Sequence, residues 1–296
     1  MTARAPARWR VDLSLVLVTL IWGATFVLVK RALADVSTLL FLALRFAVAA
    51  LVLAIAFRRQ FRTGTPVLPS LRAGAIAGCF LFSGYILQTF GLKYTSAANA
   101  GFITGLYIPL VPLLGALVFR KPPKFSEGLG VVAAFAGMAL MTVKGSLLDI
   151  NHGDLLVVAC SVVYAGHILV LGHFAATSNV QLLAFAQIAT GAAIGAVSFW
   201  WVEPPRIEWT APVCIALAVT SLLATALAFF IQTWAQKYTS PTRTAIIFSL
   251  EPVFAWITAW LLAGEVLSGR AVAGALLILA GILFVELKPI RFGRQG

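Results

Sequence analysis

Apolar residues occur in long runs that polar and charged residues separate only briefly. Ten runs reach or approach the ~20 residues that an α-helix needs to cross a bilayer, about twice the length a spanning strand needs. These runs cover residues 12–33, 37–58, 71–92, 96–119, 127–145, 154–173, 180–201, 211–236, 241–263 and 269–286. Lipid offers no partners to backbone polar groups, and the short alternating segments of a closed barrel are missing. We therefore predict an all-α integral membrane protein with ten transmembrane helices.

The composition supports a bilayer as the solvent. Hydrophobic residues make up 61% of the chain and charged residues only 11%, with a mean hydropathy of +0.98. A chain of this kind cannot expose its apolar surface to water. The loops are short, which leaves no soluble domain for an enzyme, and neither H-E-x-x-H nor Gly-x-Ser-x-Gly occurs. We expect a protein that is not an enzyme.

Two further patterns concern processing and metals. The first apolar run is full length and lacks an A-x-A-like site, so we expect it to stay as a helix and not to be cleaved as a signal peptide. Cys79, Cys160 and Cys214 lie singly in or beside apolar runs, without the paired spacing of a disulfide or metal site. We therefore expect no metal and no cofactor.

The positive charges predict the orientation. Of 22 Lys and Arg residues, six lie on one side of the membrane, Arg45 lies within a span, and 15 lie on the other side. The 15 are Arg4, Arg8, Arg10, Arg58, Arg59, Arg62, Arg72, Arg120, Lys121, Lys124, Lys237, Arg243, Lys288, Arg291 and Arg294. By the positive-inside rule, both termini are cytoplasmic. The net charge of +12 then reflects orientation and contact with anionic lipid, and no nucleic-acid partner is expected.

The chain contains an internal repeat. Six of the nine residues in 88–96 recur in 232–240, 144 positions later, including Gln-Thr at the start and Lys-Tyr-Thr-Ser at the end. At an offset of 142, Asp12 falls on Asp154 and Trp22 on Tyr164. Each half, 1–150 and 151–296, then holds five spans, and an odd number places the second copy upside down. Inverted repeats are typical of secondary transporters, which bind substrate near the midplane between the halves.

Several motifs resemble a known family. Residues 21–27 (Ile-Trp-Gly-Ala-Thr-Phe-Val), 250–255 (Leu-Glu-Pro-Val-Phe-Ala) and 261–265 (Leu-Leu-Ala-Gly-Glu), a glycine-rich last helix and Arg45 are similar to signatures of the EamA group of the drug/metabolite transporter superfamily. The resemblance covers essentially the whole chain, and the ten spans agree with it. One departure is that the first half has Arg120-Lys121-Pro122 where the second has Ala263-Gly264-Glu265.

The resemblance implies a carrier of small molecules. Within the group the chain most resembles a bacterial inner-membrane exporter of aromatic and other amino acids. We expect export of amino acids or similar metabolites by alternating access; the alternatives are a proton-coupled multidrug exporter and a passive channel. The expected partners are a small-molecule substrate and the bilayer, and the sequence leaves open whether the protein is a monomer or a homodimer.

Equivalent positions of two inverted halves should line the cavity between them. Gln88 and Gln232 are one such pair, and Tyr85 and Phe229 lie three residues before them on the same helix faces. The amides suit a carboxylate or an amino group, and the rings offer apolar or cation–π contact. Alternatively, the amides hydrogen-bond between helices.

A second set comes from the first helix of each half. Trp22 with Thr25, and Tyr164 with His167, each have the spacing that shares one helix face. An imidazole within a span can bind a carboxylate or carry a proton. Alternatively, His167 is neutral and donates one hydrogen bond.

The third set contains the most central carboxylate of the chain. Tyr107 aligns with Glu251 in the repeat, and Glu251 could bind a substrate ammonium or accept a proton. The alternative is that Glu251 stabilises backbone groups that a nearby proline leaves free. Asn99 is a weaker candidate, since it can satisfy local backbone instead.

Arg45 is the most deeply placed basic residue. It could hold a substrate carboxylate. Because the second helices of the halves align weakly, we favour a structural role in which its side chain reaches the membrane interface.

Overall fold

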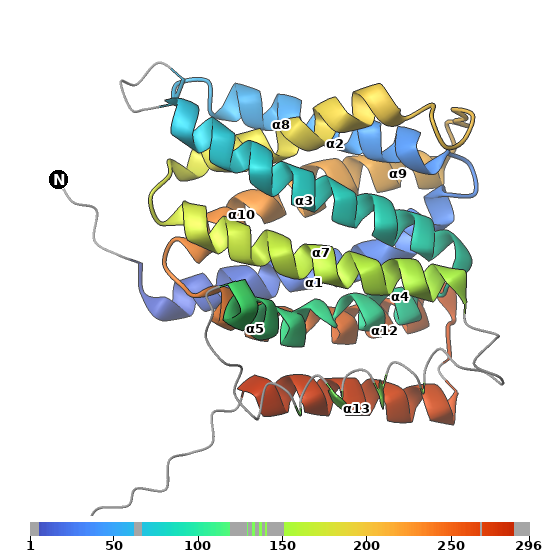
Figure 1. The fold of residues 1–296 in the computed structure, drawn as a ribbon. Coiled ribbons are helices and arrows are strands. Elements are labelled where there is room, and N and C mark those ends of the chain that lie inside the picture. The colour runs from blue at the N-terminus through green and yellow to red at the C-terminus, as the bar shows by residue number, and fades with distance from the viewer. Residues whose placement is uncertain are drawn as a thin grey trace, which may run out of the picture.

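The structure is a computed structural model that describes residues 6–61, 67–118, 151–266 and 268–286, with positions 129, 132–133, 136–137 and 140. Within these residues the regular elements are helices, and no strand occurs. In the first half they are α1 (Arg8–Ala32), α2 (Thr38–Ala56), α3 (Val67–Tyr94), α4 (Ala97–Thr104) and α5 (Tyr107–Val118). In the second half they are α7 (His152–Ala175), α8 (Val180–Ser198), α9 (Ala211–Val219), the π-helix η2 (Thr220–Leu227), α10 (Ala228–Gln236), α11 (Pro241–Phe248), α12 (Glu251–Ala263) and α13 (Gly269–Glu286). Most of the long helices lie side by side along one direction (Figure 1).

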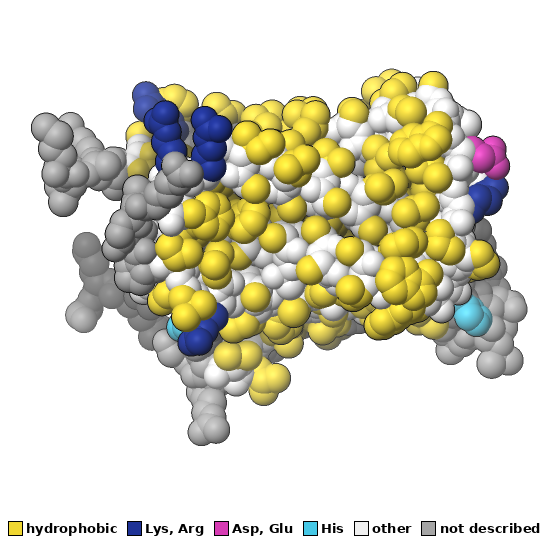
Figure 2. Space-filling model, turned by 90° about the horizontal axis from the view of Figure 1, so that it is seen from above, with side chains coloured by type: hydrophobic (Ala, Val, Ile, Leu, Met, Phe, Trp, Pro, Cys, Tyr) yellow, Lys and Arg dark blue, Asp and Glu magenta, His cyan; other side chains and the backbone are white. Residues whose placement is uncertain are grey.

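The surface is that of a multi-pass membrane protein. Seven described segments are long and apolar enough to cross a bilayer, and α12 and the first part of α13 are shorter apolar helices. Figure 2 shows an extensive apolar surface, with most of the visible Lys and Arg at one end. The predicted runs coincide with described helices except for 127–145, which falls almost wholly outside the described residues. The count of ten spans therefore stays a prediction.

Two predicted spans are broken in the middle. Pro109 has no N–H for the carbonyl of Gly105, which instead accepts from Ile108 at 3.1 Å, and α4 ends just before this point. Likewise, Pro252 has no N–H for the carbonyl of Phe248, the last residue of α11. Since proline removes the i→i−4 bond and its ring crowds that carbonyl, each span divides into two short helices. The predicted runs 96–119 and 241–263 therefore each contain two short helices, and 97–118 is among the segments long and apolar enough to cross a bilayer.

The span predicted for 211–236 is also not a regular α-helix. Its central section, η2, is π-helical, whereas α3, its counterpart in the first half, is α-helical throughout. The indole Nε1 of Trp22 donates to the carbonyl of Ala224 in this section, at 2.8 Å. π-Turns widen a helix locally and are frequent at functional sites.

Small residues bring α3 against α8. A Cβ atom added at Gly74 would lie 2.4 Å from Cβ of Ala186, and one at Gly78 would lie 2.5 Å from the carbonyl oxygen of Gln187. Only glycine permits this approach, which is how many helices in membranes pack. The contact fixes the part of α8 that carries Gln187, whose Oε1 lies 2.9 Å from Nε2 of His167.

Candidate functional site: a polar and aromatic cavity between the two halves

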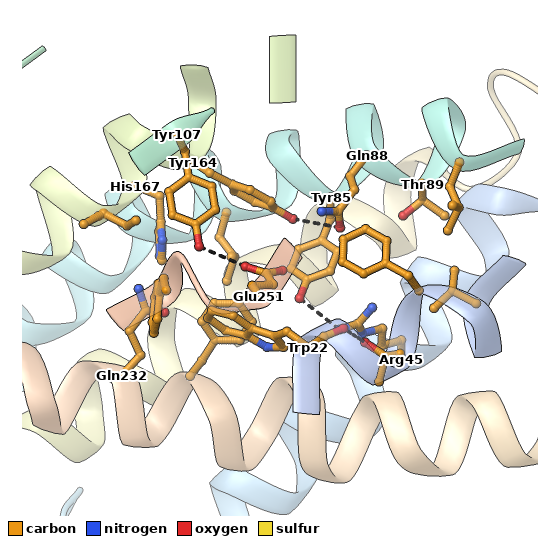
Figure 3. A pocket seen from close by; sticks show the side chains of 18 residues that line it. Trp22, Arg45, Tyr85, Gln88, Thr89, Tyr107, Tyr164, His167, Gln232 and Glu251 are labelled. Carbon is orange, nitrogen blue, oxygen red and sulfur yellow. Dashed lines mark hydrogen bonds between the residues drawn. The ribbon is translucent and has the colours of Figure 1, made fainter. Parts of the chain in front are cut away.

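A cavity lies in the middle of the bundle (Figure 3). Its volume is about 630 Å³, counting the space at its open side, within the roughly 300–1,000 Å³ of small-molecule sites. Ten of the eleven residues that the sequence singled out line it: Trp22, Thr25, Tyr85, Gln88, Tyr107, Tyr164, His167, Phe229, Gln232 and Glu251. Sequence reasoning did not single out several apolar members of the lining, among them Phe26, Leu81 and Phe248.

Asn99 does not line the cavity. It lies in the first turn of α4, where its backbone N–H donates to Oγ of Ser96 at 3.0 Å. This bond caps the helix. The structure therefore puts Asn99 at the end of the bundle, away from the other candidates.

The two halves meet at Tyr107 and Glu251. The hydroxyl of Tyr107 donates to Oε2 of Glu251 at 2.9 Å, and both side chains are buried. Each residue begins the second helix of a broken span, α5 or α12. Helix N-termini carry partial positive charge. The breaks at Pro109 and Pro252 therefore direct two helix starts toward the centre.

Arg45 also lines the cavity, and only 3% of its surface is exposed. Its Nε donates to Oγ1 of Thr225 at 2.7 Å, and its Nη2 donates to Oη of Tyr85 at 2.9 Å. In the described part of the chain, no carboxylate oxygen lies within 4.0 Å of its guanidinium. The expectation that this side chain reaches the membrane interface is wrong, because hydroxyls on α3 and η2 hold it in the interior.

His167 belongs to a directed chain of hydrogen bonds. Nε2 of His167 lies 2.9 Å from Oε1 of Gln187, whose Nε2 donates to Oγ1 of Thr233, also at 2.9 Å. Thr233 in turn donates to a backbone carbonyl at 2.6 Å. Since the Thr233 hydroxyl donates to the carbonyl, its oxygen is free to accept from the amide nitrogen of Gln187. The amide oxygen of Gln187 therefore faces His167, and this assigns the imidazole proton to Nε2. In the neutral imidazole, Nδ1 is then the acceptor.

The two repeated glutamines have different surroundings. Gln88 donates to Oγ1 of Thr104 at 3.2 Å and accepts from Oη of Tyr164 at 3.4 Å. Gln232, which is 1% exposed, donates to Gln236 at 3.3 Å, while its Oε1 has no hydrogen-bond partner among the described residues. A buried acceptor without a partner is costly and calls for an explanation.

Aromatic rings form the remaining wall. The ring of Trp22 lies 5.1 Å from those of both Phe229 and Phe248, and Tyr85 and Tyr164 are 5.8 Å apart. Such tilted and edge-to-face contacts are favourable and orient the rings. The cavity thus combines a guanidinium, a carboxyl group, two amides and an imidazole with apolar rings. It can bind a small molecule that is polar at one part and apolar at another.

Comparisons with known proteins agree on a transporter. Residues 9–143 and residues 151–287 each match the EamA-like transporter family. An uncharacterized transporter of Archaeoglobus fulgidus is 34% identical over 97% of this chain and 89% of its own length. YoaV of Bacillus subtilis, also named an uncharacterized transporter, is 24% identical over 92% of this chain and 95% of its own. A crystal structure with 19% identity matches with a TM-score of 0.69, covering 95% of this chain and 98% of that one, which shows the fold alone. The chain belongs to the EamA-like transporter family.

Proposed function

We propose that this protein exports amino acids, including aromatic ones, or similar small metabolites across the bacterial inner membrane by alternating access. The proposal includes cytoplasmic termini, as the distribution of Lys and Arg favours. It also includes a closer likeness to the amino-acid exporter YddG within the family, which the sequence motifs suggest.

One observation carries the proposal. Residues that are equivalent in the two halves line a single cavity, among them the pairs Gln88 and Gln232, and Tyr107 and Glu251. A transporter built from inverted repeats binds its substrate between the repeats, so that rocking one half against the other exposes the site alternately. The mixture of rings and polar groups suits an amphipathic molecule.

The proposed architecture is ten spans in two inverted halves, 1–150 and 151–296. Two observations support it: the family matches the chain twice, and helices α4 and α11 begin 144 residues apart, as do α5 and α12. Short, interrupted helices in corresponding positions of two halves are the best pointer to a binding site in such proteins.

Purified protein in liposomes provides the test. We expect saturable flux of one or more labelled amino acids from a broad panel, with no single-channel conductance in planar bilayers. Absence of flux for the whole panel would overturn the proposal. Unitary currents with flux that does not saturate would indicate a channel.

A second candidate is a proton-coupled multidrug exporter, which the buried pair of Glu251 and Tyr107 favours. A carboxyl group held by a hydroxyl in the interior can exchange a proton with a cationic substrate. In that case Glu251→Gln abolishes flux driven by a pH gradient while exchange of substrate for substrate continues. An unchanged pH dependence removes this candidate.

A further inference from the structure

The two charged side chains of the cavity come from different halves and do not pair with each other. Arg45 lies on α2 and Glu251 on α12, and no salt bridge joins them at 4.0 Å or less. Figure 3 shows the ring of Tyr85 between them. Resting on the proposed function, we propose that the cavity binds a zwitterion, with its carboxylate on Arg45 and its ammonium on Glu251, Gln232 and His167.

The surroundings of Arg45 suit an anion. A guanidinium stays charged at any ordinary pH and carries five N–H donors in a planar fork. The hydroxyls of Thr225 and Tyr85 accept from two of its nitrogens, and both are neutral groups. Burying a charge without a counter-charge is costly. A substrate carboxylate supplies that charge and fits the fork geometrically.

The surroundings of Glu251 suit a cation that donates several hydrogen bonds. Oε1 of Gln232 is buried without a partner, and Nδ1 is the acceptor of the neutral His167. Figure 3 shows Gln232 and His167 together on the side of the cavity away from Arg45, with Glu251 between them and Arg45. A carboxyl, an amide oxygen and an imidazole nitrogen match the three N–H donors of an ammonium group.

The aromatic rings of the cavity can attract the ammonium group and bury an apolar side chain of the ligand. The rings of His167 and Phe229 are 5.9 Å apart, so an aromatic face lies beside the ammonium site. Aromatic faces attract ammonium groups and also bury apolar side chains. The preferred ligand is therefore an amino acid with an aromatic or apolar side chain, and an amine or an acid alone should bind less well.

The test compares phenylalanine with two analogues that each lack one charge, phenethylamine and 3-phenylpropionate. Binding is measured as the ligand-induced rise in melting temperature of detergent-purified protein, and transport as competition with labelled phenylalanine in liposomes. For the unsubstituted protein we expect each analogue to bind roughly 10- to 100-fold more weakly, the loss typical of one charge-assisted hydrogen bond. Equal affinity for all three compounds would overturn the proposal, and this comparison needs no variant to fold.

Variants that remove one charge test which residue binds the carboxylate of the ligand and which binds its ammonium group. In Arg45→Gln, the affinity for phenylalanine should fall roughly 10- to 100-fold, while the affinity for phenethylamine, which has no carboxylate, is unchanged. In Glu251→Gln, the affinity for phenylalanine should fall as much, while the affinity for 3-phenylpropionate, which has no ammonium group, is unchanged. Arg45→Lys and Glu251→Asp keep the charges and should retain part of the affinity. The controls are Arg72→Gln and Glu208→Gln, at exposed positions. A variant that weakens all three compounds equally contradicts the assignment.

The outcomes separate this inference from the proposed function. If no amino acid is transported but phenylalanine still stabilises the protein more than either analogue, the export function fails and the zwitterion site stands. If amino acids are transported but the analogues bind as well as phenylalanine, the export function stands and the zwitterion site fails.

Discussion

The two ends of the bundle hold the halves together in different ways. Helices α2 and α8 begin 142 residues apart and occupy equivalent places. Asn179 caps α8 from within its own half, and its Oδ1 accepts from two backbone N–H groups at 3.0 and 3.2 Å. Ser37 gives α2 no such cap. The N–H of Thr38 donates instead to Glu203, which comes from the other half and lies 2.8 Å from Nζ of Lys93.

Helices α4 and α11 repeat this difference. Ser96 and Ser240 cap both helices alike, at 3.0 and 3.2 Å. Only α4 has a second cap from the other half: Glu265 accepts from the first two backbone N–H groups of this helix at 3.1 and 3.0 Å. In α11, Arg243 instead makes a two-bond ion pair with Asp12 on α1, at 3.0 and 2.7 Å.

The difference indicates that the end with Arg243 and Asp12 opens more readily than the end with Glu203 and Glu265. We call the end with Glu203 and Glu265 the glutamate end, and the end with the pair of Arg243 and Asp12 the arginine end. Opening the glutamate end uncaps two helices, at about 1 kcal/mol each. Opening the arginine end breaks an ion pair whose side chains are 41% and 29% exposed, and such pairs contribute about 0–1 kcal/mol. Asn179 at this end also bonds across the halves, to Ser70 at 3.0 Å and to Gln60 at 3.1 Å. In the proposed orientation the arginine end faces the cytoplasm, where an exporter takes up its substrate.

The largest effect is expected when both cross-half caps are removed. In Glu203→Ala/Glu265→Ala, the glutamate end should open roughly 30-fold more often, since about 2 kcal/mol is lost and 1.4 kcal/mol corresponds to a factor of ten. The reporter is a cysteine introduced by Thr89→Cys in the cavity lining, in a protein whose three native cysteines have been replaced. The measurement is its rate of labelling by a membrane-impermeant maleimide added at the glutamate end.

Glu208→Ala is the matched control for that experiment. Glu208 lies in the same loop as Glu203, but its side chain is 60% exposed and pairs with the neighbouring Arg206. The control should label at the rate of the parent protein. Equal rates in the double variant and the parent would contradict the capping argument.

The next effect concerns stability. Asn179→Ala should lower the free energy of unfolding by about 1 kcal/mol, because α8 loses its own cap. Ser37→Ala should lower it by less, since Ser37 loses only a bond from the backbone of Arg206 at 3.2 Å. Denaturant unfolding in detergent measures both, and Asn179→Asp, which keeps the acceptor, is the control. Equal losses at the two positions would show that α2 and α8 are capped alike.

A smaller effect is expected at the arginine end. In Arg243→Gln, labelling of the same cysteine from the arginine side should rise at most about fivefold, which corresponds to about 1 kcal/mol. High salt should produce a similar rise in the parent protein, because it screens exposed pairs. The swap Asp12→Arg/Arg243→Asp should reverse most of the effect. A rise larger than that of the double glutamate variant would reverse the order of the two ends.

The repeat in the sequence located most of the cavity but not its cation. Recurring residues such as Gln88 and Gln232 align the other helices, so alignment brought ten of the eleven candidates together. At the offset of the starts of α2 and α8, Arg45 corresponds to Gln187, and an arginine and a glutamine give no sign of equivalence. The structure alone shows that Arg45 lines the cavity and that Gln187 bonds His167, which lines it too.

The interruptions and the cross-half caps differ in how visible they are in the sequence. Pro109 and Pro252 stand in the sequence and mark the two breaks, which the lengths of the apolar runs do not reveal. The π-helical section has no comparable marker, because it depends on backbone register and packing against α2. Glu203 and Glu265 cap helices 165 to 168 residues away along the chain, and only the packed halves bring them there.

The smallest expected effect is a pH dependence of the glutamate end. Partial burial raises the pKa of Glu203, but hydrogen bonds from Lys93 and Thr38 outweigh it and hold the pKa below its ordinary value of 4.5. A carboxyl group with a lowered pKa stabilises the folded state above its ordinary pKa, and this contribution disappears as the pH falls through the lowered value. The melting temperature of the parent should therefore exceed that of Glu203→Gln at neutral pH, and the difference should shrink below pH 4.5. A difference that stays constant into acid would mean that the charge of Glu203 contributes nothing, and that shape alone holds this end closed.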